Sequence, residues 1–249
     1  MTRGTKKPVV AIIQARMGSE RLPGKVLLDI EGQTMLERVV RRVQKAKSID
    51  EVVVATTDRP ADIVVVGEAE RLGVKVVRGN EDDVLDRFRQ AAVESDAATI
   101  VRVSADSPFV DPEVTDMVVD AFRSQDVDYA SNKLNPSFPL GLDVEAFSRD
   151  ALETTWNEAT EPYERSHVTV RMYSSTSAMR LLPVTTTPDR HDWRWTVDTP
   201  EDLEFARQVF RRLGGGNEFS WRDVVTLVEQ NPELAAINSS VRSKPIEHG

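Results

Sequence analysis

Residues 9–25 have the sequence VVAIIQARMGSERLPGK, in which an apolar run passes directly into a loop that contains glycine, arginine and lysine. The run Val9–Gln14 is apolar until its last residue, a pattern typical of a parallel strand that is buried on both faces. The loop that follows extends to about Gly32. Thr34 and Glu37 have the spacing of a capping box, which predicts the start of a helix. The apolar positions of that helix are Leu36, Val39, Val40 and Val43.

The same alternation of strand and helix continues through the first half of the chain. Strands are predicted at residues 51–55, 74–77 and 99–103, and helices at residues 61–72, at 83–94 and from Pro112 onward. Alternating strands and helices indicate βαβ units and therefore a mostly parallel sheet. The predicted fold class is α/β, with a mostly parallel, mixed sheet flanked by helices.

The second half of the chain is less regular. Strands are predicted at residues 127–131, 142–147, 179–184 and 194–197, the second of them as an edge or mixed strand because polar and apolar residues alternate in it. Helices are predicted at residues 149–159, 199–213 and 221–229. We expect residues 1–7 to form a flexible tail, residues 8–230 a single domain with an excursion near 130–190, and residues 231–249 a poorly ordered polar tail.

The composition limits the classes of protein and of site. The chain has 249 residues, 40% of them apolar, which is enough for one sizeable core. No run approaches the roughly 18 to 20 apolar residues of a membrane helix, and no signal peptide is evident, so we expect a cytoplasmic location without membrane attachment. The net charge of -9 argues against nucleic acid as a partner. The absence of cysteine excludes thiolate sites, and three histidines disfavour a zinc site.

The loop after the first strand concentrates positive charge. Arg16, Arg21 and Lys25 lie within ten residues, and Gly18 and Gly24 allow backbone amides to approach a ligand closely. Ligands of open α/β sheets bind beyond the carboxyl ends of strands, and three cations suit a triphosphate. The loop has neither the Walker nor the G-x-G-x-x-G pattern. From the residues alone, an anion site and a solvated basic loop are equally consistent with this sequence.

Two aspartates follow predicted strands. Asp106 comes after residues 99–103, and Asp198 comes after residues 194–197. If both strands end at the same rim of the sheet, the two carboxylates meet there, and Mg²⁺ prefers one or two carboxylates together with phosphate oxygens and water. The alternative, which is favoured for either aspartate taken singly, is that each one merely ends a strand or caps a turn.

At these three motifs the sequence resembles the cytidylyltransferase family that includes 3-deoxy-manno-octulosonate and acylneuraminate cytidylyltransferases, and it is most similar to the spore-coat polysaccharide branch. Residues 15–25 match the signature A-R-x-x-S-x-R-L-P-G-K, residues 105–108 resemble the metal motif G-D-x-P, and residues 197–203 match V-D-T-P-E-D-L. Residues 81–88 and 141–145 are typical of the branch. The resemblance covers about residues 9–213.

The resemblance implies a Rossmann-like fold of the nucleotide-diphospho-sugar transferase type, CTP as donor and Mg²⁺ as cofactor. It implies transfer of CMP to a small acidic acceptor, expected to be a sugar acid, in surface polysaccharide or glycoconjugate biosynthesis. It also implies a homodimer, with residues 136–140 and 163–173 supplying the contact.

The site residues follow from the resemblance by position. Catalysis is assigned to Arg16, Arg21, Lys25, Asp106 and Asp198, the last two as metal ligands. The nucleotide is assigned to Gln14, Ala15, Arg16, Gly18, Ser19, Arg21, Lys25, Thr57, Arg102 and Ser104. The acceptor is assigned to Asp143, Glu145 and His167.

Two positions depart from the family pattern. Ala105 replaces the usual glycine before the metal-binding aspartate and is expected to crowd the phosphate or reshape the turn. Gln14 replaces a proline that is common in the sugar-acid enzymes, although it suits the spore-coat branch. Two other functions stay open at this point: transfer to a phosphorylated or phosphonate acceptor or a sugar 1-phosphate, and a catalytically weak nucleotide-binding partner in polysaccharide assembly.

Overall fold

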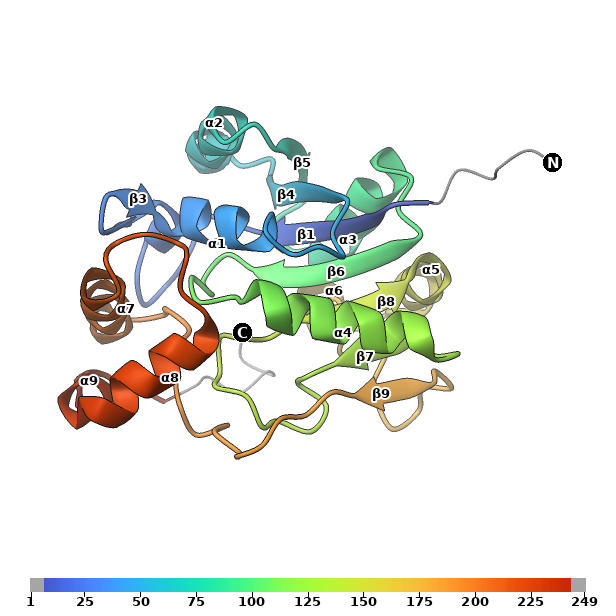
Figure 1. Cartoon of the computed structure of the whole chain (residues 1–249). Helices are drawn as coiled ribbons and strands as arrows, with labels where there is room; N and C mark the ends of the chain where they lie inside the picture. The colour runs from blue at the N-terminus through green and yellow to red at the C-terminus, as the bar shows by residue number, and fades with distance from the viewer. Residues whose placement is uncertain (1–6, 243–249) are drawn as a thin grey trace.

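The computed structural model describes residues 7–242 and arranges them around a seven-stranded sheet with the strand order β5-β4-β1-β6-β8-β7-β9 (Figure 1). In chain order the strands are β1 (Val9–Gln14), β4 (Glu51–Thr57), β5 (Lys75–Gly79), β6 (Thr99–Ser104), β7 (Tyr129–Ser131), β8 (Glu145–Ser148) and β9 (Leu181–Pro183). Strands β5, β4, β1 and β6 are parallel, whereas β8 is antiparallel to both β6 and β7. The predicted fold class is therefore confirmed.

Helices cover both faces of this sheet. In chain order they are α1 (Met35–Val43), α2 (Ile63–Arg71), α3 (Val84–Glu94), α4 (Pro112–Ser124), α5 (Arg149–Glu158), α6 (Pro162–His167), α7 (Pro200–Arg212), α8 (Trp221–Gln230) and α9 (Pro232–Ile237). Short segments η1 (Lys25–Leu27) and η2 (Pro60–Asp62) and a hairpin of β2 (Asp29–Ile30) and β3 (Gln33–Thr34) interrupt the connections. Within residues 7–242 no helix has the length and apolar composition needed to cross a membrane.

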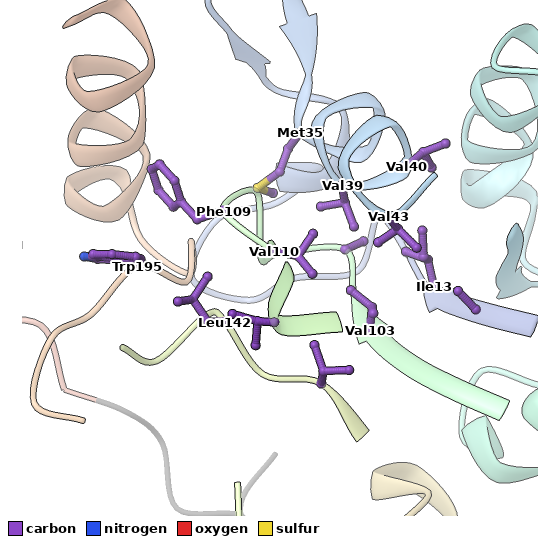
Figure 2. Packing of buried hydrophobic residues seen from close by; sticks show 14 of the residues in the cluster. Ile13, Met35, Val39, Val40, Val43, Val103, Phe109, Val110, Leu142 and Trp195 are labelled. Atoms are coloured by element: carbon purple, nitrogen blue, oxygen red, sulfur yellow. The ribbon is translucent and has the colours of Figure 1, made fainter. Parts of the chain in front are cut away.

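The apolar run of β1 is buried on both faces because successive side chains point to opposite sides of the sheet. Ile13 belongs to a core shared with α1, α4 and α7, and Ile12 belongs to a second core shared with α3 and α5. Figure 2 shows Ile13 of β1 and Val103 of β6 on the side of the sheet that faces Val39 and Val43 of α1. The continuous hydrophobicity of the run thus reflects its central place in the sheet.

Helix α1 starts as predicted, but only half of the capping box forms. The Thr34 hydroxyl oxygen accepts from the Glu37 amide at 3.0 Å. The Glu37 carboxylate instead bonds Arg71 at the end of α2 and so ties the two helices together.

Two predictions about elements are wrong. Residues 194–197 form no strand, and their pairing is an isolated parallel bridge between Arg194 and Leu140. The tail is ordered as far as the structure describes it, because Pro232–Ile237 form α9 and bury Leu234. Asn231 followed by Pro232 is a helix-start signal that a purely compositional interpretation overlooks. Residues 1–6 and 243–249 lie outside the described part of the chain.

Gly141 allows two segments to approach each other closely. Its φ is +108°, and a Cβ placed there would lie 2.5 Å from the Thr196 amide nitrogen and 2.7 Å from the Trp195 carbonyl carbon. On either side of this approach the Leu140 amide donates to the Trp193 carbonyl at 2.8 Å, and the Trp195 amide donates to the Leu140 carbonyl at 2.7 Å. Glycine at this position therefore fixes the path of the segment that leads to Asp198.

We expect Gly141→Ala to lower the free energy of unfolding by about 2–3 kcal/mol, since the added methyl meets backbone atoms that cannot rotate away. Gly67→Ala in α2, where a Cβ meets nothing within 4 Å, is the matched control and should stabilise the protein by about 0.5–1 kcal/mol. Guanidinium denaturation measures both values. Equal stability of Gly141→Ala and the wild type would contradict the close approach.

Candidate active site

The basic loop and the two aspartates meet at one edge of the sheet. Strands β1 and β6 are parallel neighbours whose last residues, Gln14 and Ser104, are paired, so the loop and the segment with Asp106 leave from the same edge. The Val197 amide donates to the Asp106 carbonyl at 2.8 Å and brings Asp198 alongside. The predicted meeting of the two carboxylates at one rim is observed, although the segment before Asp198 is not a strand.

The Lys25 ammonium lies between these carboxylates. Its Nζ is 2.8 Å from Asp106 Oδ2, 2.7 Å from Asp198 Oδ1 and 2.9 Å from the Val197 carbonyl. An ammonium has three N–H donors, and three acceptors surround this one. Lys25 is only 9% exposed. Burial acts to lower the pKa of Lys25, but the Asp106 and Asp198 charges outweigh it and raise this pKa.

The second oxygen of Asp198 is held by two arginines. Asp198 Oδ2 lies 2.9 Å from Arg21 and 2.7 Å from Arg194. Burial acts to raise the pKa of Asp198, but the Lys25 charge and hydrogen bond, followed by Arg194 and Arg21, lower it. Asp198 therefore stays ionised.

The C-terminal segment reaches the same corner of the site. The side-chain amide of Asn238 donates through Nδ2 to the Arg194 carbonyl at 3.0 Å and to Asp202 Oδ1 at 2.9 Å. Arg21 donates to the Arg242 carbonyl at 3.1 Å. No pattern in the sequence connects residues after Asn231 with the loop after β1.

The loop itself faces solvent. Gly18 is exposed and Ser19 half-buried, and the Arg16 side chain is 48% exposed, with Glu81 Oε1 3.4 Å from its guanidinium. Glu81 also binds Arg59 at 2.8 Å. Of the three cations in the loop, Arg16 is the most accessible and Lys25 the least.

Thr57 is not exposed as a residue that contacts the nucleotide would be. It is fully buried, and its hydroxyl donates to Asp62 Oδ2. The other oxygen of Asp62 accepts from the Met17 amide at 2.6 Å. Thr57 therefore supports the basic loop through Asp62, and the structure gives it no exposed surface for a nucleotide.

A polar network continues along the same edge from Gln14. Arg102 Nε donates to Gln14 Oε1 at 3.1 Å, and Arg102 also binds Glu145 at 3.1 Å. Glu145 accepts from Lys133 at 2.8 Å and from the Thr169 hydroxyl at 2.7 Å. Burial acts to raise the pKa of Glu145, but Arg102 and Lys133 outweigh it and lower this pKa to about 2.

The remaining predicted acceptor residues border this network. Burial raises the pKa of Asp143, and the Glu145 and Asp106 carboxylates add to that effect while Lys133 opposes it. The Asp143 carboxylate therefore interacts electrostatically with the network and with Asp106. His167 ends α6, and its carbonyl accepts from the amide of Thr169.

The aspartate pair has the chemistry that a magnesium ion needs. Asp106 and Asp198 already share one cation, the Lys25 ammonium, with an oxygen each. No group of three or more potential metal ligands occurs among residues 7–242, so an ion held here would take its other ligands from phosphate and water, as Mg²⁺ does in nucleotide sites.

The cytidylyltransferase family model matches residues 10–234 of the chain. The chain belongs to the cytidylyltransferase family. It is 34% identical to the spore coat polysaccharide biosynthesis protein SpsF of Bacillus subtilis, over 91% of this chain and 96% of SpsF. It is 37% identical to the 3-deoxy-manno-octulosonate cytidylyltransferase of Syntrophotalea carbinolica, but over only 53% of this chain and 48% of that one.

A solved structure supports the same assignment. The cytidylyltransferase from Leptospira borgpetersenii matches this structure with a TM-score of 0.90 and 30% sequence identity, over 96% of this chain and 100% of that chain. The resemblance seen in the sequence motifs, including that to the spore-coat branch, is therefore confirmed.

Ala105 has a backbone conformation that does not depend on glycine. It is 2% exposed and packs in the hydrophobic core, and its amide donates to the Gln14 carbonyl at 3.1 Å. Its φ is not positive, so the backbone does not require glycine here. The expected effect of the alanine methyl on the phosphate stays a prediction.

Lys133 was not among the predicted site residues. This residue follows β7 at the same edge of the sheet, because β8 is antiparallel to both β6 and β7. Its position two residues after the predicted strand 127–131 was the available signal, since the same rule identified Asp106.

We expect Glu145→Gln to lower the free energy of unfolding at pH 7 by on the order of 3 kcal/mol, because the substitution leaves Arg102 and Lys133 without their shared carboxylate. The folded-state pKa of Glu145, about 2, lies below its ordinary value of 4.5. The stabilisation is therefore complete above about pH 5 and is lost as the pH falls toward 2.

Urea denaturation of the wild type and Glu145→Gln between pH 7 and pH 3 checks this expectation. The difference in stability should be constant down to about pH 5 and then shrink. Glu70→Gln, at an exposed position of α2, is the control and should show no such difference. A difference that grows as the pH falls would contradict the assignment.

Proposed function

We propose that this protein is a magnesium-dependent cytidylyltransferase that transfers CMP from CTP to a small acidic acceptor of the sugar-acid class. The observation that carries the proposal is the Lys25 ammonium bound to both Asp106 and Asp198 beside an exposed, glycine-containing basic loop. This arrangement supplies cations for phosphate and carboxylates for a divalent ion within one small region.

The reaction is an in-line displacement at the α-phosphorus of CTP. The acceptor hydroxyl oxygen forms the new bond to phosphorus, the bond to the β-phosphate oxygen breaks, pyrophosphate leaves, and the hydroxyl proton is released. Arg16, Arg21 and Lys25 offset the negative charge on the phosphates, and the loop glycines admit backbone amides to them. Gln14 and Ser104, at the paired strand ends, border the nucleotide.

Asp106 and Asp198 would hold Mg²⁺. When bound, the ion supplies charge neutralisation at the phosphate oxygens. The protein's own part is to point both carboxylates at one place and, through Lys25, Arg194 and Arg21, to keep Asp198 ionised.

An acidic acceptor is favoured by the cations of the polar network. Lys133 is accessible, with 36% of its side chain exposed, and Arg102 lies beside it on Glu145. Two cations near the aspartate pair offer partners for the acceptor carboxylate, while Asp143 and His167 border the same region. The name of one relative, a 3-deoxy-manno-octulosonate cytidylyltransferase, points to the same class of acceptor. The name of the other, a spore coat polysaccharide biosynthesis protein, points to polysaccharide biosynthesis.

We also propose a cytoplasmic homodimer in which residues 136–140 and 163–173 form the contact. Tyr163 is 43% exposed and is available to a second subunit, whereas Phe138 is buried in its own chain.

The experiment measures CTP binding and turnover separately. CTP with Mg²⁺ should raise the melting temperature, and CTP with EDTA should do so much less. Pyrophosphate release is then measured with 3-deoxy-manno-octulosonate, N-acetylneuraminate, a sugar 1-phosphate and an alkyl phosphonate. Release with a sugar acid supports the proposal, release with a phosphorylated or phosphonate compound alone overturns the acceptor class, and the absence of CTP stabilisation overturns the nucleotide assignment.

We expect Asp106→Asn to lower kcat by about a hundredfold or more while the protein stays folded, because a neutral amide is a much weaker magnesium ligand than a carboxylate. The melting temperature should fall, since Lys25 loses one of its two carboxylate partners. Asp120→Asn, on the exposed face of α4, is the control and should keep full turnover. Steady-state pyrophosphate release measures both variants, and near-normal turnover of Asp106→Asn would refute the metal assignment.

A further inference from the structure

The arrangement around Lys25 leaves it no donor for a phosphate. Two carboxylates and the Val197 carbonyl occupy its three N–H groups at 2.7–2.9 Å. A lysine that binds a nucleotide phosphate from this position must give up at least one of those partners. Lys25 thus has two sets of partners, and it cannot hold both completely.

A divalent ion would need the same carboxylate oxygens that Lys25 now binds. Mg²⁺ takes carboxylate oxygens at about 2.0–2.1 Å. The Lys25 nitrogen already lies 2.8 Å from Asp106 Oδ2 and 2.7 Å from Asp198 Oδ1, so an ion bridging those oxygens would lie at most about 4.8 Å from the ammonium nitrogen. Two like charges this close at a mostly buried position repel strongly. The two cations therefore compete for the pair of oxygens that Lys25 now holds.

Groups other than Lys25 also hold Asp198 in place. Arg194 binds Asp198 at 2.7 Å and is itself bound to the fully buried Asp202 at 2.9 Å. The Asp198 amide also donates to Asp202, at 3.0 Å. The carboxylate therefore stays available to whichever cation takes the place of the lysine.

We propose that Lys25 is an internal competitor of the divalent ion: it occupies the two aspartates until nucleotide phosphates draw it away, and its departure opens the metal position. The proposal rests on the proposed function insofar as the nucleotide supplies the competing phosphates. It makes metal and nucleotide binding mutually dependent, since by linkage each must strengthen the other by the same factor. Neither ligand alone then holds the site in its reactive arrangement.

The test is Lys25→Met, which removes the ammonium and keeps the apolar part of the side chain. Mn²⁺ serves as the probe, and its binding is followed by electron paramagnetic resonance without nucleotide. We expect Lys25→Met to bind Mn²⁺ on the order of tenfold more tightly than the wild type, because a repelling charge is gone. The same variant should bind CTP more weakly in the presence of Mn²⁺. These opposite changes distinguish a competitor from a structural tether, whose loss would weaken both.

Two further variants locate the effect. Adding Asp106→Asn to Lys25→Met should abolish the gain in Mn²⁺ affinity. Lys45→Met is the control, since Lys45 also binds a carboxylate and a carbonyl, those of Glu218 and Asn217, but lies outside the site. It should leave both affinities unchanged. If Lys25→Met does not fold, Lys25→Gln removes the charge while keeping hydrogen-bond donors and should show the same gain.

The outcomes separate the two proposals. If CTP stabilises the wild type but neither Lys25 variant gains Mn²⁺ affinity, the competition is refuted and the proposed function stands. If CTP fails to stabilise the wild type, the proposed function is refuted whatever Mn²⁺ does. Unchanged or weaker Mn²⁺ binding in a folded Lys25 variant overturns the inference.

Discussion

The ion pairs of Lys25 with Asp106 and Asp198 join three parts of the chain that are far apart in sequence. The lysine ends the loop after β1, Asp106 follows β6, and Asp198 precedes α7. Removing one carboxylate leaves the mostly buried Lys25 ammonium short of a partner, which costs more than the pairing itself contributes. The loop therefore takes its place only when the ends of β1 and β6 and the start of α7 are all in position.

The sheet separates its stabilising interior from its chemical edge. The middle of β1 is wholly apolar on both faces, and it is the last residue, Gln14, that begins the polar network with Arg102 and Glu145. Buried ion pairs are weak evidence of stability, because apolar residues of similar volume often serve as well. Under the proposed function, a charged network at the carboxyl edge is explained by the acceptor that it would bind rather than by the stability of the fold.

Local patterns in the sequence predicted much of this structure. The apolar run of β1, the Thr34 cap and the Asp111–Pro112 start of α4 each depend on a few neighbouring residues, and each is observed. The segment 194–197 has strand-like composition, but a strand needs a partner along its length. Here the close approach at Gly141 offers a single bridge, and no local pattern reports that contact.

The site, too, was predicted only where it depends on local motifs. Asp106, Asp198 and Lys25 belong to motifs that can be recognised along the chain, and the structure brings them together. The burial of Thr57 and the presence of Lys133 in the network depend on which strands are neighbours, and the antiparallel place of β8 between β6 and β7 decides that. Sequence spacing alone does not give this order.

A single buried carboxylate, that of Asp202, links the C-terminal segment to the site. Asp202 accepts from the amides of Asp198 and Thr199, so it caps α7 and fixes the Asp198 backbone at once. It also binds Arg194 and Asn238. Asp202 is fully buried, and its charge is tolerated because these donors satisfy it. The segment after Asn231, which its composition marks as a tail, thus helps to hold the carboxylate that the lysine and the metal would share.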